Sequence, residues 1–207
     1  MLNFILIASS GQRVGKSYLA KKLLELNLAQ NHSGFAIPIK SKSFNIYNSF
    51  NDEIEGTLIN CDEFYQTKKD DKIFFNDKSP RDLVCAYSDL VQDFLGPEIW
   101  GQVSYNEANR HKELRSVATL TTALDDWRRT TESDFLSRQS NVNLLTIYLD
   151  RETDEKAPKP SSGSSHYEGI IKPEDCDIHF VYKSDYSNFN ELLQLITTHV
   201  NQFKTND

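Results

Sequence analysis

The chain has 207 residues, of which 38% are hydrophobic and 26% charged, and its formal net charge is −7. This length and composition are those of a globular protein with one full hydrophobic core. The acidic balance argues against a broad nucleic-acid-binding face, which needs clustered lysines and arginines, but it leaves room for a small basic pocket that binds a phosphorylated metabolite.

Cysteine spacing and the N-terminal segment both bear on location. The three cysteines, Cys61, Cys85 and Cys176, form neither a CxxC pair nor a metal-finger pattern, which favours buried thiols in a reducing compartment. The apolar start at residues 2–8 is too short for a membrane span and lacks the basic flank of a signal peptide. We therefore expect a cytoplasmic protein with no membrane partner.

The N-terminal segment has the pattern of a strand, a glycine-bearing turn and a helix. Residues 4–8 (Phe-Ile-Leu-Ile-Ala) form a short continuous apolar run, which is typical of a buried parallel strand. After the turn, apolar residues recur at helical spacing at Leu19, Ala20, Leu23 and Leu24. This succession predicts the opening of a βαβ unit.

The turn between this strand and this helix matches a phosphate-binding P-loop, whose pattern is a glycine, any four residues and then Gly-Lys-Ser/Thr. Residues 10–17 read Ser-Gly-Gln-Arg-Val-Gly-Lys-Ser. Only the first glycine is replaced, by Ser10, whose Cβ the loop's backbone angles must tolerate. In such a loop, backbone N–H groups and a helix N-terminus hold phosphate oxygens. Lys16 would reach the β- and γ-phosphates, and the Ser17 hydroxyl would bind Mg²⁺. The predicted ATP-binding residues are Gly11, Gln12, Arg13, Val14, Gly15, Lys16, Ser17 and Tyr18.

A second helix is predicted to begin after Ser79. Ser79 is a suitable N-cap, Pro80 suits the first helical position, and Asp82 can complete a capping box. Gly96 followed by Pro97 is a typical helix end. The apolar residues between these signals form one stripe, which we expect to lie in the core: Leu83, Val84, Tyr87, Leu90, Val91 and Phe94.

Three later segments have the length and content of strands, at residues 118–124, 144–149 and 178–182. Residues 150–165 are rich in charge, Pro, Ser and Gly, and they predict a mobile loop. Asn188 with Glu191 could cap a final helix, whose apolar stripe is Phe189, Leu192, Leu193, Ile196 and Val200. Because strands alternate with helices, we expect a single α/β domain over residues 1–207, with a doubly wound, mostly parallel sheet flanked by helices.

Among P-loop proteins, the chain fits a small kinase best. None of its segments resembles the guanine-binding motif of switch GTPases, and 207 residues leave little room for the accessory domains of an ATP-driven motor. The binding site for the phosphate acceptor must then lie in the rest of the chain.

Five short segments resemble, in order, motifs of the phage-type deoxynucleoside monophosphate kinases. The motifs FAxPxK, kSPRdL, fGPdiW, DvR and HxxEG are similar to residues 35–40, 78–83, 94–100, 126–128 and 166–169, the last shortened by one residue. Glu132 also falls near an acidic position of that family. Besides Ser10, the chain departs from the family at Gln92, where many relatives have an arginine, and at Ser88-Asp89, where they have a Gly-Thr pair.

The resemblance implies a P-loop fold of the nucleoside monophosphate kinase type. It also implies that the protein transfers the γ-phosphoryl group of ATP, with Mg²⁺, to a deoxynucleoside 5′-monophosphate. A bacteriophage or prophage source, a role in DNA precursor supply and a place in the host cytoplasm follow from the same likeness. We expect a nucleotide substrate as the partner, and the sequence is compatible with a homodimer.

The acceptor carries about two negative charges, so its pocket needs fixed cations, and arginine binds phosphate through two parallel contacts. The predicted acceptor ligands are Lys40, Arg81, Arg128 and Arg129. Lys40 is chosen by the resemblance alone, Arg81 stands at a helix N-terminus, and Arg128 follows a strand, where open α/β sheets bind ligands. Asp126 could orient Arg128 or hold a Mg²⁺-bound water. The predicted catalytic residues are Lys16, Arg128 and Asp126. Each of the four predicted acceptor ligands could instead be a solvated surface residue.

Two other interpretations stay open. Residues 58–65 (Leu-Ile-Asn-Cys-Asp-Glu-Phe-Tyr) are similar to the strand and DxFY segment of uridine kinase-like enzymes. There an aspartate, here Asp62, would deprotonate a sugar hydroxyl, a base that an ionised monophosphate does not need. The second alternative is an ATP-binding interaction module without catalysis, which the changes at Ser10 and Gln92 would permit.

Overall fold

The computed structural model describes residues 1–11, 14–51, 61, 64–65, 70–72, 77–152, 171–183 and 185–203. The chain divides into two compact units. We call the first, Met1–Gly34 with Trp100–Asp207, the sheet unit, and the second, Phe35–Ile99, the helical unit.

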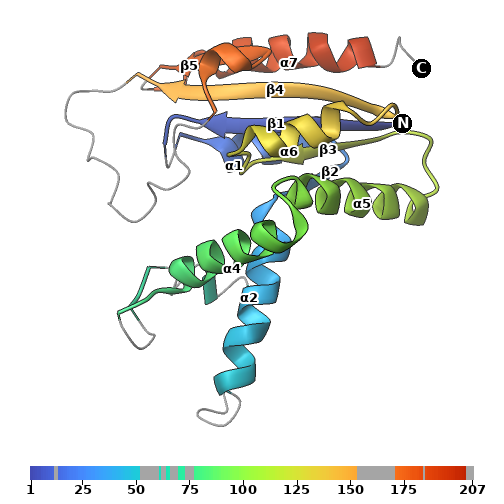
Figure 1. Cartoon of the computed structure of the whole chain (residues 1–207). Helices are drawn as coiled ribbons and strands as arrows, with labels where there is room; N and C mark the ends of the chain where they lie inside the picture. Colours follow the sequence, from blue (N-terminus) through green and yellow to red (C-terminus); the bar gives the residue numbers. More distant parts are fainter. Residues whose placement is uncertain are drawn as a thin grey trace. The chain divides into compact units, whose positions relative to one another are not determined.

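The sheet unit is built on a five-stranded sheet whose strands all run parallel (Figure 1). The strands are β1 (Leu2–Ser9), β2 (Asn31–Ser33), β3 (Leu120–Leu124), β4 (Val142–Arg151) and β5 (Ile178–Tyr182). Their order in the sheet is β2-β3-β1-β4-β5. The predicted α/β architecture with a parallel sheet flanked by helices is therefore confirmed.

The helices of this unit lie on both faces of the sheet. They are α1 (Lys16–Glu25), α5 (Ile99–Leu114, whose first residue falls in the helical unit), α6 (Thr130–Ser137), the short 3-10 helix η1 (Pro173–Asp175) and α7 (Phe189–Phe203). The connection through α1 runs from β1 towards β2, whereas the connection through α6 runs from β3 towards β4. Because crossovers between parallel strands are right-handed, these opposite directions put α1 and α6 on opposite faces.

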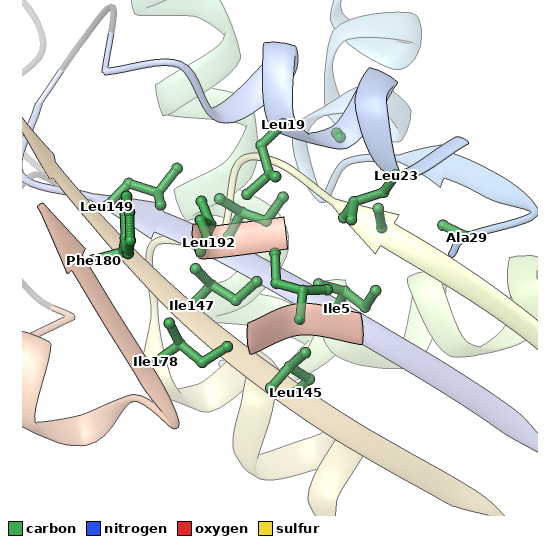
Figure 2. Packing of buried hydrophobic residues seen from close by; sticks show 14 of the residues in the cluster. Ile5, Leu19, Leu23, Ala29, Leu145, Ile147, Leu149, Ile178, Phe180 and Leu192 are labelled. Atoms are coloured by element: carbon green, nitrogen blue, oxygen red, sulfur yellow. The ribbon is translucent and has the colours of Figure 1, made fainter. Parts of the chain in front are cut away.

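The face covered by α1 and α7 holds the main hydrophobic core (Figure 2). Ile5 and Ile7 of the central strand β1 are fully buried there, and Leu19 of α1 and Leu192 of α7 pack in the same cluster. Phe4, which points to the other face, is also fully buried. Burial on both faces explains why β1 is a continuous apolar run and not an alternating one.

The predicted last helix is confirmed as α7, and Leu192, Ile196 and Val200 of its stripe are buried. The Asn188 side chain ties the start of this helix to β5. Its Oδ1 accepts a hydrogen bond from the backbone N–H of Lys183 (3.0 Å), and its Nδ2 donates to the carbonyl of Val181 (2.9 Å). These bonds fix the turn that joins β5 to α7.

The helical unit contains α2 (Ala36–Asn51) and α4 (Pro80–Leu95), which contact each other. The predicted start of α4 is confirmed, because Ser79 Oγ accepts from the backbone N–H of Asp82 (3.3 Å) and the Asp82 carboxylate accepts from the N–H of Ser79 (2.8 Å). The helix ends at Gly96, at a φ of +97°. Phe44, Phe64 and Tyr65 form the aromatic core of the unit.

The predicted core stripe of α4 is wrong at Leu90 and Phe94, and its other residues, Leu83, Val84, Tyr87 and Val91, are only half-buried. Leu90 is 54% and Phe94 80% exposed, whereas the polar residues Ser88 and Gln92 are buried. Gln92 Nε2 lies 3.5 Å from Ser88 Oγ, one turn away on the same face. Hydrogen-bonded polar side chains can take a buried face of a helix, and the hydrophobic period alone does not reveal this.

Two smaller expectations can be compared with the structure. Of the loop predicted over residues 150–165, only 150–152 are described, and the rest lies outside the described residues. All three cysteines are described; none of them takes part in a disulfide, and each is half-buried where full burial was expected. Across the described ranges, no helix has the length and apolar content needed to cross a membrane.

Candidate functional site

The predicted phosphate loop connects the end of β1 at Ser9 to the start of α1 at Lys16. Gly15 has a φ of +101°, which L side chains rarely adopt, so this position requires glycine. Ser10 is not among the described residues with positive φ, and its N–H donates to the carbonyl of Leu149 (3.2 Å). The Cβ of Ser10 is therefore tolerated by the backbone of the loop.

Lys16 folds back over this loop. Its Nζ donates to Ser9 Oγ and to the carbonyl of Gly11 (3.2 Å), and Ser9 Oγ donates to that same carbonyl (2.7 Å). A Cβ built on Gly11 would have no atom of the described residues within 4 Å, so these residues leave open space beside Gly11. Ser17 is exposed, and its hydroxyl makes no hydrogen bond to any described residue. A lysine ammonium, a helix N-terminus and an available hydroxyl fit the phosphates and Mg²⁺ of a nucleoside triphosphate.

The other predicted ATP-binding residues differ in their surroundings. Gln12 and Arg13 lie outside the described residues. The Val14 side chain belongs to the hydrophobic core, so only its backbone can face a ligand. The Tyr18 ring is half exposed and packs against the ring of Phe189 on α7, at 5.3 Å between centroids.

An aromatic pair beside the phosphate loop was not predicted. A Cβ at Gly15 would lie 3.7 Å from Tyr182 and 4.0 Å from Tyr186, whose rings are 5.2 Å apart. The Arg151 guanidinium carbon lies 4.9 Å from the Tyr186 ring centroid. Burial raises the pKa of Tyr182, whose hydroxyl has no hydrogen-bond partner among the described residues. The available signal in the sequence was two tyrosines four residues apart, the first at the end of the last strand and the second after it.

A second group of polar residues follows β3, the strand beside β1. Leu124 pairs with Leu6, so the residues after Leu124 leave the sheet at the same edge as the phosphate loop. The Asp126 carboxylate lies against Gly34, where a Cβ would be 2.7 Å from Asp126 Oδ2. Glycine is needed at position 34 to admit this carboxylate.

Asp125, the first residue after β3, pairs with a histidine of β2. Asp125 Oδ2 is 3.3 Å from His32 Nε2, which is ion-pair distance but outside hydrogen-bonding geometry. The Asp125 carboxylate raises the pKa of His32, and partial burial opposes this rise. The acidic doublet after a strand was visible in the sequence, but its histidine partner was not.

The turn between Asp126 and α6 holds the two predicted arginines. The buried Trp127 indole donates to the carbonyl of Arg129 (2.8 Å), and Glu132 Oε2 accepts from the N–H groups of Arg128 (3.4 Å) and Arg129 (3.3 Å). The Arg128 guanidinium is partly exposed and forms no ion pair or hydrogen bond with the described residues. Burial, with a smaller effect of the Asp126 charge, raises the pKa of Glu132 to about 8.

Lys40 and Arg81, the other predicted acceptor ligands, belong to the helical unit. Lys40 lies on α2 and has no ionic partner in the described part of the chain. Arg81 in the first turn of α4 binds Asp70 through two contacts, from Nε to Oδ1 (2.6 Å) and from Nη2 to Oδ2 (3.2 Å). A phosphate would have to displace the Asp70 carboxylate to reach this arginine. Asp62 and the segment 166–169 lie outside the described residues.

The structure thus brings the predicted phosphate loop and the Asp126–Arg129 turn to one edge of one parallel sheet. No protein-family model matches this sequence, and no curated protein matches it either. The functional argument therefore rests on the chain's own residues.

Proposed function

We propose that the protein is a kinase that transfers the γ-phosphoryl group of ATP, with Mg²⁺, to a (deoxy)nucleoside 5′-monophosphate. The observation that carries this proposal is the arrangement at the carboxyl edge of the sheet unit. Lys16 lies over the phosphate loop after β1, and Arg128, without an ionic partner among the described residues, follows the adjacent strand β3. Ligands of open α/β sheets bind at this edge.

The strand order supports the finer fold proposal, a P-loop protein of the nucleoside monophosphate kinase type. The phosphate loop follows the central strand β1, in the sheet order β2-β3-β1-β4-β5. The connection that leaves β1 runs towards β2, whereas the connection that leaves its neighbour β3 runs in the opposite direction, towards β4. Such a reversal opens a crevice outside the carboxyl ends of the strands. The deoxy form of the acceptor, the role in DNA precursor supply, the cytoplasmic location and a homodimer rest on the sequence alone.

The proposed transfer of the phosphoryl group requires fixed cations from the protein and little covalent chemistry. An oxygen of the monophosphate attacks the γ-phosphorus, the bond from that phosphorus to the bridging oxygen breaks, and ADP leaves. The transferring group carries its charge on three oxygens, so positioning and charge neutralisation supply the rate. Lys16 serves the donor phosphates in this proposal, and Arg128 serves the acceptor or the transferring group.

The proposal is tested by substitution of Arg128 in the whole chain. Arg128→Ala should lower turnover of the monophosphate by about 10²–10³-fold, because one pre-organised cation is lost from the transition state. Arg128→Lys should recover only part of this loss, since an ammonium cannot form the planar two-point contact. ATP affinity should hardly change, because the P-loop sets it.

Monophosphate kinetics and calorimetric titration with ATP are measured on each variant. Arg110→Ala, at an exposed position on α5, is the matched control and should behave like the wild type. Near-normal monophosphate kinetics in Arg128→Ala would contradict the assignment and show that this arginine is a solvated surface residue.

A further inference from the structure

We propose that Glu132 is a positioning residue, whose buried carboxyl group fixes the backbone of the Asp126–Arg129 turn and so directs the Arg128 guanidinium to the acceptor. This inference rests on the proposed function and deepens its acceptor side. Glu132 itself touches no reacting atom in this account. It acts through the two arginines whose N–H groups it binds.

The hydrogen bonds of the turn fix the backbone on both sides of Arg128. Glu132 Oε2 accepts from the N–H groups of Arg128 and Arg129 at 3.4 and 3.3 Å. The carbonyl of Arg129 accepts from the Trp127 indole (2.8 Å) and from the N–H of Glu132 (3.2 Å). The Arg128 side chain takes no part in these bonds, so it stays available while its Cα is held.

Helices α5 and α6 pack closely at the position of Glu132. Glu132 is 5% exposed. On α5, a Cβ at Gly101 would lie 2.9 Å from the Glu132 carbonyl oxygen and 3.0 Å from Phe135 Cβ, so only glycine lets the two helices approach this closely. The charged groups that act on Glu132 are Asp126 and Arg129, while α5 contributes an uncharged glycine at the contact.

Helix capping alone does not require such burial. The capping box of α4 uses Asp82, which is exposed to solvent and binds the N–H of Ser79. Burying a carboxyl group has a desolvation cost, and an exposed acid would cap α6 without it. Glu132 instead uses its longer side chain to reach both arginine N–H groups. This cost is explained when the turn must keep one conformation for Arg128.

The test separates the length of the side chain from its ionisable carboxyl group. Glu132→Asp keeps the carboxyl group but withdraws it by one methylene, whereas Glu132→Gln keeps the length and an oxygen that can accept both bonds. We expect kcat/KM for the monophosphate to fall on the order of 10²-fold in Glu132→Asp, the cost of a misplaced catalytic group. Glu132→Gln should recover most of this loss, and ATP affinity by calorimetry should be the same in all variants. Asp134→Asn, at an exposed acid on α6, is the control.

Amide hydrogen exchange supplies a readout that does not depend on activity. The exchange rates of the Arg128 and Arg129 N–H groups should rise by about tenfold in Glu132→Asp, as expected when a hydrogen bond is lost. They should stay near the wild-type values in Glu132→Gln. An active Glu132→Asp, or a Glu132→Gln as impaired as Glu132→Asp, would overturn the positioning role alone. A wild-type protein that transfers phosphate to no monophosphate would overturn the proposed function as well, so the two failures are distinguishable.

Discussion

Lys16 places a positive charge over the phosphate loop without support from the hydrophobic core, since its ammonium donates to the Ser9 hydroxyl and the Gly11 carbonyl. Lys16→Ala should therefore change the free energy of unfolding by no more than about 0.5 kcal/mol. Under the proposed function, turnover should fall by about 10²–10³-fold, because the transferring phosphoryl group would lose a pre-organised cation. Chemical denaturation and steady-state kinetics measure the two quantities, with exposed Lys21→Ala on the same helix as the control. Unchanged turnover with normal ATP binding would mean that the loop is only a helix cap.

Glu132 gives a pH dependence of stability with a definite sign. Its pKa is raised to about 8 in the folded protein, against about 4.3 in an unfolded chain. Between these values the folded state binds more protons than the unfolded state, so the contribution of Glu132 to stability is present below pH 4 and is lost as pH rises to 8. Glu132→Gln removes this effect. Its free energy of unfolding relative to wild type should increase between pH 5 and 8 by up to about 1.4 kcal/mol per pH unit, whereas Asp134→Asn should show no such trend. An unchanged difference across this range would contradict the buried position of the carboxyl group.

At the level of elements, α4 turns its C-terminal apolar residues to solvent. Phe94 is 80% exposed, while Phe44 of α2 lies in the aromatic core of the helical unit. Phe44→Ala should cost about 3–5 kcal/mol of unfolding free energy, the range for a buried aromatic residue. Phe94→Ala should stay within about 0.5 kcal/mol of the wild type. The two free energies are measured by denaturant unfolding. Equal losses of unfolding free energy in the two variants would mean that Phe94 is buried, as the predicted core stripe of α4 required.

The elements that could be predicted carry their signals locally. The buried strand β1 is an apolar run because both of its faces are covered, and the start of α4 is encoded in the four residues of its capping box. β2 could not be found in this way. Its residues Asn31–Ser33 are half-buried and polar, and the strand is held at the sheet edge by backbone pairing with β3.

The candidate site also contains residues with a local sequence signal and residues that only the tertiary structure brings together. Gly15 and Lys16 belong to a motif within eight residues, so the sequence spacing alone was enough to predict them as site residues. The Arg81–Asp70 pair, the Asp126–Gly34 contact and the burial of Glu132 against Gly101 join residues that are distant in sequence. Such contacts depend on the tertiary structure, and no local sequence pattern predicts them.

For the whole molecule, a net charge of −7 would oppose the approach of the two anionic substrates of the proposed reaction. The cations of the proposed reaction must therefore act at short range, inside a site that excludes part of the solvent. Lys16 and Arg128, at one edge of the sheet unit, meet this requirement in the proposal. The proposed joint role of Lys16 and Arg128 in phosphoryl transfer can be measured only in an assay of the complete reaction.

Phosphorus NMR of the protein with ATP, Mg²⁺ and a panel of acceptors is the most direct test of the proposed activity. The panel holds nucleoside monophosphates, nucleosides and a sample without acceptor. We predict equal amounts of ADP and nucleoside diphosphate with at least one monophosphate, and no ADP in the other samples. Transfer to nucleosides alone would contradict this account and favour a hydroxyl acceptor, in which case Asp62→Asn should abolish activity. ATP binding without any transfer would instead identify a non-catalytic module.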